Sequence, residues 1–354
     1  MFYREAGQFK TSYASDQAIF PIAQDRWFIF GLVAFAFVGV PLVAGPYLYT
    51  EVLIPVLILS IAAIGLNILT GYCGQLSLGS GGFMAVGAYA AYNLALRLPQ
   101  TNLILVFLFA GVMAMLVGLL FGLPSLRIKG FYLAVATLAA QFFLEWAFAR
   151  VKWFTNYAPS GSVAIGQIDL FGYPIDTPAK TYLLVLAITV VLALAAKNLV
   201  RSWIGRTWMA IRDMDIAAEI IGIRPLHAKL SAFAVSSFYI GVAGALWAFL
   251  RLGSWEPLAF DVNRSFQVLF MIIIGGLGTI LGAFLGAAFI VLVPIVLNQL
   301  PSWLGIPIST AAVSHIEFML FGAMIVLFLI VEPHGLARLW AIAKEKLRLW
   351  PFPY

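Results

Sequence analysis

Charged residues are scarce in this chain. Asp, Glu, Lys and Arg make up 10% of its 354 residues, whereas hydrophobic residues make up 63%. A soluble domain carries roughly 25% charged and about 45–50% apolar residues, so this chain cannot cover a water-facing surface. Soluble enzymes, disordered proteins and secreted disulfide scaffolds are therefore excluded. The single cysteine, Cys73, cannot form an internal disulfide, and an all-α polytopic membrane protein remains.

Nucleotide-binding and metal-binding motifs are missing as well. The sequence contains no G-x-x-x-x-G-K-[ST] and no H-E-x-x-H, and its glycine strings lie in apolar segments rather than in a strand–turn–helix. We therefore expect a chain that is not an enzyme and that binds no metal and no cofactor itself. An intramembrane transferase or protease is one rival hypothesis. It would need a cluster of catalytic His, Asp or Ser residues within the spans, and the chain has only three histidines.

Long hydrophobic runs are abundant. A helix needs roughly 20 apolar residues to cross about 30 Å of hydrocarbon. The runs predict about ten transmembrane helices, although the glycine-rich junction of the eighth and ninth leaves a re-entrant turn open. The predicted spans are 27–45, 51–69, 79–97, 102–122, 131–149, 180–197, 229–250, 265–280, 281–299 and 315–331.

Basic residues are distributed unevenly around these spans. With the N-terminus inside, 15 of the 21 Lys and Arg residues fall on the inside, in agreement with the positive-inside rule. We therefore expect both termini in the cytoplasm. The predicted organisation is a cytoplasmic segment 1–26, a transmembrane domain 27–331 and a cytoplasmic tail 332–354. Two hydrophilic segments interrupt the transmembrane domain, 150–179 on the outside and 198–228 in the cytoplasm.

Glycine is concentrated in two membrane segments, 71–89 and 275–286. One interpretation is tight packing between helices, because Gly278, Gly282 and Gly286 repeat every four residues and would share one helix face. The other is a pair of discontinuous helices between two pseudo-repeated halves, where a substrate path runs. The candidate path residues are five glycines of the two segments and four polar residues in or next to the spans: Asn67, Gln75, Gly79, Gly82, Gln141, Glu145, Gly275, Gly276 and Gly278.

Glu145 has a second interpretation. A carboxylate is costly in lipid and is expected to face protein or a water-filled cavity. Near the end of its span, Glu145 can also lie at the membrane interface or pair with Arg150.

The cytoplasmic segment contains a candidate amphipathic helix, at 205–224. Such a helix lies on lipid headgroups, is solvated, or docks into a groove on a partner. The small residues Ala217, Ala218 and Gly222 favour docking, because they let another protein surface approach closely. The large apolar residues are predicted to share one helix face: Trp208, Ile211, Ile216 and Ile220.

Several of these motifs resemble those of one transporter family. Asp215-x-Ala217-Ala218-x-x-x-Gly222 is similar to the acidic-Ala-Ala…Gly loop of bacterial ABC-importer permeases. Longer stretches, in collinear order over about 65 to 290, resemble the LivM-type permeases of branched-chain amino-acid importers. They are GLNILTGYCGQLSLGSGGFMAVGAYAAY at 65–92, LRIKGFYLAVATLA at 126–139, RTWMAIRDMDIAAEIIGI at 206–223 and LFMIIIGGLGTILGAFLGA at 269–287.

This resemblance implies a type II ABC importer-like fold and a set of partners. The expected partners are a LivH-type permease, two ABC ATPase subunits that bind the ATP, a periplasmic solute-binding protein and membrane lipid, but no nucleic acid. The expected location is the bacterial inner membrane. The coupling loop that seats in the ATPase comprises Gly205, Arg206, Arg212, Asp215, Ala217, Ala218 and Gly222.

The expected mechanism is alternating access driven by the ATPases. The binding protein is expected to dock on charges outside the membrane, which are Arg150, Lys152, Arg251 and Arg264. The resemblance leaves the solute open among branched-chain amino acids, urea, amides and aromatic acids. A stand-alone secondary transporter or channel is the second rival hypothesis, and it would need neither an ATPase nor a docking loop.

Overall fold

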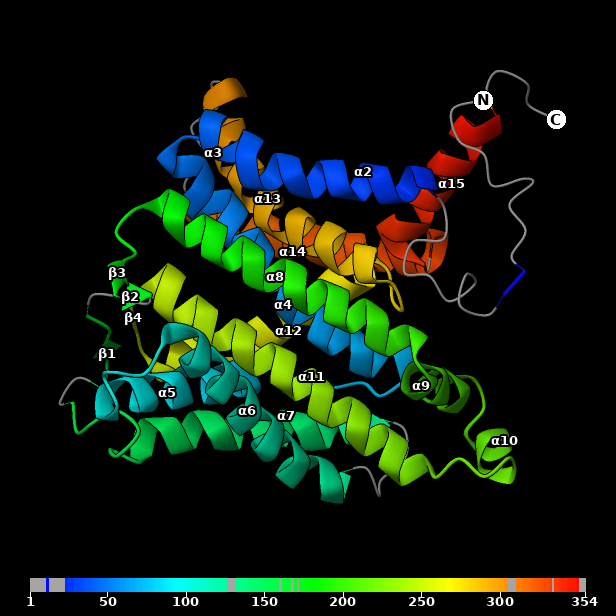
Figure 1. The fold of residues 1–354 in the computed structure, drawn as a ribbon, viewed down its shortest axis with the longest axis horizontal. Helices are drawn as coiled ribbons and strands as arrows, with labels where there is room; N and C mark the ends of the chain where they lie inside the picture. The colour runs from blue at the N-terminus through cyan, green and yellow to red at the C-terminus, as the bar shows by residue number, and fades with distance from the viewer. Residues whose placement is uncertain are drawn as a thin grey trace.

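The fold is a bundle of helices, shown in Figure 1. The computed structural model describes residues 11–12, 23–125, 131–158, 161–166, 169–170, 172–304, 310–332 and 334–349. Most of the expected segment 1–26, and parts of the expected tail, lie outside the described residues. The α-helices are α2 (Ala23–Ala34), α3 (Val40–Val43), α4 (Ile54–Asn67), α5 (Ser80–Arg97), α6 (Leu103–Ser125), α7 (Phe131–Arg150), α8 (Pro178–Arg201), α9 (Trp203–Asp213), α10 (Asp215–Ile220), α11 (Pro225–Trp247), α12 (Val262–Gly275), α13 (Ile280–Leu304), α14 (Thr310–Val331) and α15 (Gly335–Leu349).

Short elements extend or join these helices. The strands lie at one end of the bundle, where β1 (Val163–Ala164) pairs with β4 (Ser254–Trp255) and β2 (Asp169–Leu170) pairs with β3 (Tyr173–Pro174). We call this the outer end and the end that carries α9 and α10 the inner end. The π-helical segments are η1 (Phe35–Gly39), η2 (Leu48–Leu53), η3 (Ile68–Tyr72) and η4 (Ala248–Leu252), and η5 (Pro257–Phe260) is a 3₁₀ turn.

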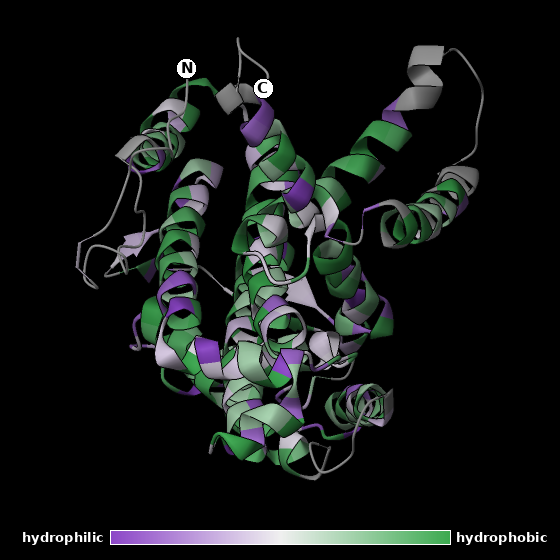
Figure 2. Ribbon diagram, turned by 90° about the vertical axis from the view of Figure 1, so that its right-hand side faces the viewer, coloured by the Kyte–Doolittle hydropathy of each residue, from purple (hydrophilic) through white to green (hydrophobic). Residues whose placement is uncertain are grey.

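Eight described helices are long and apolar enough to cross a membrane. The two other expected spans coincide with α5 and α14, so the prediction of about ten spans agrees with the fold. Viewed from the inner end, apolar residues dominate the helices of the bundle (Figure 2). Large side chains such as Leu120, Trp146 and Val191 are exposed on the outside of the helices, at 67%, 56% and 64%. Because hydrocarbon is as apolar as these side chains, this surface fits lipid. The protein is therefore a multi-pass membrane protein.

The chain repeats one arrangement in its two halves. In the first half α4 is followed by α5, α6 and α7, and in the second α11 is followed by α12, α13 and α14. The packing pairs correspond, because α5 packs on α6 as α12 packs on α13. Both α4 and α11 end in a π-helical segment and a glycine with a φ of +70°, Gly74 and Gly253. The structure thus supports the expected pseudo-repeat.

The uncertain junction at 265–299 is a turn between two helices. α12 ends at Gly275, α13 begins at Ile280, and the two helices pack together along their length. Gly276 and Gly278 occupy the turn with φ of +123° and +73°, a backbone region that other residues rarely adopt. The expectation that Gly278 shares a helix face with Gly282 and Gly286 is therefore wrong, because Gly278 precedes α13.

Close helix contact does occur at the other two glycines. A Cβ atom at Gly286 would lie 1.8 Å from the Met271 carbonyl oxygen, and one at Gly282 would lie 2.7 Å from the Gly275 oxygen. Glycine at these two positions lets the backbones of α12 and α13 approach. The packing interpretation thus holds for α13, and the broken-helix interpretation holds for the turn before it.

A glycine contact also joins the two halves at the centre of the bundle. α11 packs against α4, α5 and α6. A Cβ atom at Gly87 of α5 would lie 2.0 Å from the Gly241 carbonyl oxygen, and one at Gly244 would lie 2.1 Å from that of Met84. We expect Gly87→Val to destabilise the protein by about 1–3 kcal/mol, since overpacking moves backbone. Thermal unfolding in detergent measures this effect.

The matched control for this prediction is Gly31→Val. Gly31 lies on α2, and a Cβ atom there would meet nothing within 4 Å. The control changes helix propensity in the same way without the clash, so its melting temperature is expected to stay near that of the native chain. Equal melting temperatures for the two variants would show that the close contact between α5 and α11 does not limit stability.

Candidate functional site: the α9–α10 segment and the turns it contacts

The predicted coupling segment forms two short helices. α9 ends at Asp213 and α10 begins at Asp215, because Met214 between them is extended, with φ −160° and ψ 94°. The expectation of one apolar helix face across 205–224 is therefore wrong. Trp208 and Ile211 are buried on α9, whereas Ile216 and Ile220 are exposed on α10. The break turns the two sets of apolar side chains in different directions.

α9 is anchored to the bundle by its buried side chains. Trp208 is fully buried, and its indole Nε1 donates a hydrogen bond to the Ser231 hydroxyl of α11 at 2.9 Å. Fully burying a large apolar side chain stabilises a fold by about 2–3 kcal/mol. Ala218 of α10 is also buried, at 2% exposure. The segment is therefore held firmly at the inner end, where a force on it reaches α11.

α10 and its flanks expose a cluster of large apolar side chains. Met214, Ile216, Ile220 and Ile221 are 69%, 68%, 81% and 74% exposed. We call these four residues the apolar patch. The small residue Ala217 is exposed beside them, and Gly222 ends the segment with a φ of +92°. Clustered apolar side chains on a segment that projects beyond the spans mark a surface for a protein partner or a membrane.

The remaining predicted coupling residues have structural contacts of their own. A Cβ atom at Gly205 would lie 2.0 Å from the Val200 carbonyl oxygen, so α8 and α9 can meet only around a glycine. The Asp215 carboxylate lies 3.9 Å from Lys229 Nζ of α11. Arg206 is exposed and donates a long hydrogen bond of 3.4 Å to the Arg201 carbonyl oxygen. Among the described residues, the Arg206 side chain thus forms no hydrogen bond to the membrane helices beyond the end of α8.

Arg212 links the segment to the membrane helices. Its Nη1 donates a hydrogen bond of 2.9 Å to the carbonyl oxygen of Gly71, in η3, and its Nε lies 2.9 Å from the Asp213 carboxylate. Gly71 in turn lies against Gly278, because a Cβ atom at Gly71 would be 2.3 Å from the Gly278 nitrogen. A charged donor strengthens such a hydrogen bond. α9 is therefore bonded directly to η3, the segment that continues α4.

Asn67 joins this point to the turn between α12 and α13. Its side-chain Oδ1 accepts from Gly278 N at 2.8 Å, and its Nδ2 donates to the Thr279 carbonyl at 2.7 Å. Both amide atoms are thus used on the backbone of the other half. We call Asn67, Gly71, Gly278 and Thr279 the inner turn cluster. It connects the two pseudo-repeated halves at the inner end.

The C-terminal helix α15 packs on the same turn. A Cβ atom at Gly276 would lie 2.5 Å from the His334 carbonyl oxygen, and one at Gly335 would lie 2.6 Å from that of Ile274. At its other end, α15 is tied to α2 by an ion pair of 3.0 Å between Lys344 and Asp25. α15 thus covers the turn that the inner turn cluster holds.

A second polar cluster lies where α5 and α12 begin. Gln141 of α7 is fully buried; its Oε1 accepts from Gly82 N, and its Nε2 donates to the Phe260 carbonyl at 2.8 Å. Ser265 of α12 donates to the same Oε1 at 3.0 Å and accepts from Gly81 N at 2.7 Å. Buried polar side chains need such partners in a membrane. This central cluster holds the broken ends of α5 and α12 together.

The other predicted path residues lie around these clusters. Gly79 lies against α7, where a Cβ atom would be 2.8 Å from the Thr137 carbonyl oxygen. Gln75 and Glu145 are half-buried, and Gln75 donates its backbone N–H to Leu69 O at 3.0 Å. Gly275 contacts Gly282 of α13. The structure thus brings four of the nine path candidates, Asn67, Gly82, Gln141 and Gly278, into the two clusters, and their role in transport stays a prediction.

The four predicted docking charges fall into two groups. Arg150 and Lys152 are exposed near the C-terminus of α7. Arg251 instead forms an ion pair of 2.6 Å with Glu51 of η2. The Arg264 guanidinium is half-buried and lies 4.6 Å from the centre of the Trp247 ring. The second pair therefore lines the interior of the outer end.

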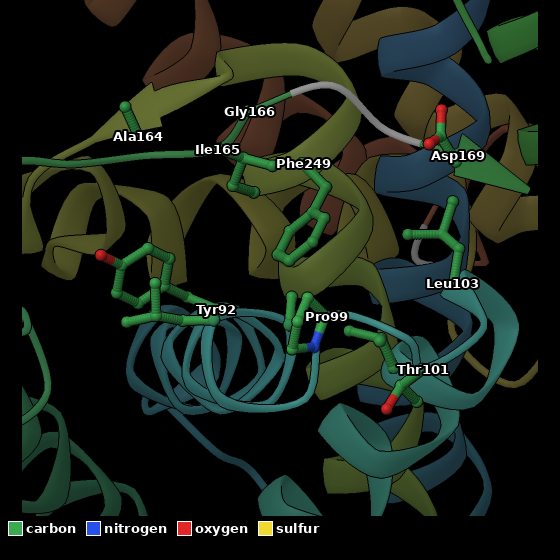
Figure 3. Close-up of a pocket in the computed structure, with 12 residues that line it drawn as sticks. Tyr92, Pro99, Thr101, Leu103, Ala164, Ile165, Gly166, Asp169 and Phe249 are labelled. Atoms are coloured by element: carbon green, nitrogen blue, oxygen red, sulfur yellow. The ribbon is translucent and has the colours of Figure 1, made fainter.

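An apolar pocket opens at the outer end, between α5, α6 and the strands. Its volume is about 260 Å³. Figure 3 shows Tyr92, Pro99 and Phe249 on its walls, with Asp169 at one edge. Ile165 lines it from the chain after β1, where its N–H donates to Gly253 O at 3.0 Å. This bond connects the segment that carries β1 to the C-terminus of η4, which continues α11.

Cys73 provides a probe of packing at the inner end. It is fully buried, and burial raises the pKa of its thiol to about 12, against a smaller opposite effect of Lys229. With that pKa, only about one thiol in ten thousand is ionised at pH 8, and the thiolate is the reactive form. We expect no maleimide labelling of the folded chain at pH 7–8 and complete labelling after unfolding in SDS.

The positive control for this experiment is a Met214→Cys variant. Met214 is 69% exposed, so its replacement is expected to label within minutes under the same conditions. Labelling of Cys73 in the native chain at the same rate as in this control would show that the contact between η3 and α9 opens readily.

The comparisons with known proteins agree with this geometry. The family model described as "Branched-chain amino acid transport system / permease component" matches residues 48–330. The chain is 29% identical over 299 residues to the high-affinity branched-chain amino acid transport system permease protein LivM of Escherichia coli (strain K12), covering 78% of this chain and 67% of that one. No solved structure matches.

Two further relatives are less similar in sequence. The chain is 25% identical over 276 residues to a probable branched-chain amino acid transport permease protein LivM of Methanocaldococcus jannaschii, covering 74% of this chain and 78% of that one. It is 27% identical over 245 residues to the ribose import permease protein RbsC of Haemophilus influenzae, covering 65% and 71%. The family model covers well over half of the chain. The chain therefore belongs to the family of permease components of branched-chain amino acid transport systems, and is a non-enzymatic membrane subunit of an ABC importer.

Proposed function

We propose that this chain forms half of a translocation path for branched-chain amino acids or related small organic solutes. The other half is a LivH-type permease, and two ABC ATPase subunits bind the ATP, so this chain binds no cofactor. A periplasmic binding protein delivers the solute. The names of the relatives support the solute class, and the whole assembly sits in the bacterial inner membrane with both termini in the cytoplasm.

The apolar patch is the observation that carries this proposal. It belongs to a segment that projects from the inner end and is anchored by Trp208. Small and apolar side chains on such a segment fit a groove on another protein. A stand-alone transporter has no use for this arrangement. The coupling residues Gly205, Arg206, Arg212, Asp215, Ala217, Ala218 and Gly222 therefore belong, in this proposal, to the segment that carries the ATPase contact.

The opposite end receives the binding protein in this proposal. Arg150 and Lys152 are exposed there. Surface charges of one sign guide the first encounter with a protein partner and the orientation in which it docks. The apolar pocket of Figure 3 lies at the same end of the bundle. The path between the two ends runs past the central cluster and the inner turn cluster, because these hold the broken helices of both halves.

Reconstitution tests this function. The chain is tagged and purified from its native membrane together with whatever subunits remain bound, and uptake of labelled L-leucine is measured in proteoliposomes. We expect ATPase subunits to co-purify, and uptake to require ATP and the binding protein. Uptake of L-leucine by the chain alone, without ATP, would instead support the stand-alone secondary transporter.

A further inference from the structure

A cavity at the outer end has more positive than negative groups in its lining. It has a volume of about 560 Å³, within the range of small-molecule sites, and Glu51, Trp247, Arg251, Arg264 and Gln267 supply its polar lining. Arg251 is paired with Glu51 at 2.6 Å. Among the described residues no carboxylate lies within ion-pairing distance of the Arg264 guanidinium, which donates to Gln267 Oε1 at 2.5 Å. The nearby Asp261 carboxylate accepts instead from the Arg264 backbone N–H, at 3.1 Å, and acts on the guanidinium only through its charge. The cavity therefore contains two guanidinium groups and one carboxylate.

A buried donor beside this charge is also unsatisfied. Trp247 is 8% exposed, and within the described residues its indole Nε1 has no hydrogen-bond partner. The Arg264 guanidinium stacks over the same ring at 4.6 Å. A buried N–H without a partner costs about 1–3 kcal/mol, and a charge without one costs more. Both groups are donors, so the ligand that satisfies them must offer acceptor oxygens and a negative charge.

The rest of the lining limits the ligand further. Leu59, Ile290 and Val291 are apolar, and Pro55, Leu252 and Pro294 complete these walls. Glu51 is the acid of the cavity, and a carboxylate that already bonds a guanidinium can accept from an ammonium as well. A neutral sugar or urea would leave the Arg264 guanidinium without a hydrogen-bonded counter-charge. A small amino acid offers a carboxylate, an ammonium and an apolar side chain together.

We propose that this cavity is a binding site for the zwitterion of a small apolar amino acid. The ligand carboxylate meets Arg264 and the Trp247 N–H, its ammonium meets Glu51, and its side chain lies against Leu59, Ile290 and Val291. The cavity is a binding site on the translocation path at its outer end, and this inference rests on the proposed function. It selects amino acids over neutral solutes within the permease itself, beyond whatever selection a binding protein makes.

Ligand protection of a cysteine tests the site without relying on transport. A Val291→Cys variant is assembled with its partner subunits in proteoliposomes and treated with a small anionic thiosulfonate, while Cys73 stays buried. We expect millimolar L-leucine to slow the modification several-fold and ribose or urea to leave the rate unchanged. A cysteine at 291 that is never modified would overturn the proposal, because the cavity would then be closed to solutes.

Replacements at two residues, Arg264 and Trp247, locate the ligand groups. Combined with Val291→Cys, Arg264→Gln is expected to raise the L-leucine concentration for half protection by about ten-fold or more, as the loss of a charge-assisted hydrogen bond predicts. Arg264→Lys keeps the charge but not the planar fork, so it is expected to restore part of the affinity. Trp247→Phe keeps the ring, removes the N–H, and is expected to weaken protection by a few-fold.

Analogues and a parallel assay separate the remaining outcomes. 4-Methylpentanoate lacks the ammonium, so it is expected to protect less well than L-leucine in the native background and equally well when Glu51 is replaced by Gln. Equal protection by ribose, or no protection by L-leucine, would overturn the proposal.

ATP-dependent uptake is measured on the same vesicles. Retained uptake without protection refutes the site alone, whereas protection without ATP-dependent uptake refutes the proposed function alone.

Discussion

Replacing Ile216 or Ile220 with glutamate is expected to release the ATPase subunits from the permease. Both side chains are more than two-thirds exposed in the apolar patch, so they contribute little to the fold of this chain. Removing a central apolar anchor from a protein interface typically weakens binding by about 2 kcal/mol or more, which is a factor of roughly 30. A buried carboxylate adds a desolvation cost. Co-purification of ATPase subunits with the tagged permease measures the effect, and L-leucine uptake is expected to fall with it.

Leu258→Glu is the matched control for these variants. Leu258 is a large apolar side chain with 67% exposure, but it lies in η5, towards the outer end of the bundle. It therefore makes the same chemical change without touching the apolar patch, and we expect normal recovery of ATPase subunits. Full recovery of these subunits with both Ile216→Glu and Ile220→Glu would contradict the coupling role, and the patch would then have to contact lipid instead.

The membrane helices could be predicted from the sequence because their signal is local. Each run of about 20 apolar residues specifies a helix by itself. The predicted spans therefore coincide with the described helices, including the two less secure ones at 265–280 and 281–299. The position of α9 and α10 was also predictable, because a hydrophilic segment separates two apolar runs there, whereas its role in coupling stays a prediction. The division of this segment at Met214 was not predictable, since one extended residue leaves no mark on the apolar spacing.

The contacts that join the halves could not be predicted in the same way. Asn67 and Gly278 are 211 residues apart, and Arg212 and Gly71 are 141 apart, so no local pattern relates them. The glycine content of 71–89 and 275–286 predicted close packing or broken helices there. It did not predict that Asn67 forms hydrogen bonds to the turn between α12 and α13. One signal was available and unused. Glu51 is the only carboxylate of the predicted span 51–69, and an isolated acid in a span needs a partner, which here is Arg251.

Arg212→Gln is expected to separate binding of the ATPases from the transport that they drive. Arg212 directs one guanidinium nitrogen at the Gly71 carbonyl oxygen rather than at solvent, and Gly71 lies against Gly278 in the inner turn cluster. The apolar patch is unchanged in this variant, so ATPase subunits are expected to co-purify normally. Losing a hydrogen bond of this kind, worth about 1.5 kcal/mol, is expected to reduce ATP-dependent uptake by roughly ten-fold.

The matched control is Arg206→Gln on the same helix. Arg206 is exposed, and its side chain makes a long hydrogen bond of 3.4 Å to Arg201 O within the same region, so its loss leaves the connection to α4 intact. Uptake is therefore expected to stay near the native rate. Equal losses of uptake in both variants would show that positive charge on α9 matters and the bond to Gly71 does not. Loss of ATPase binding in Arg212→Gln alone would place Arg212 in the interface itself, because a link that only transmits motion is not needed for the subunits to meet.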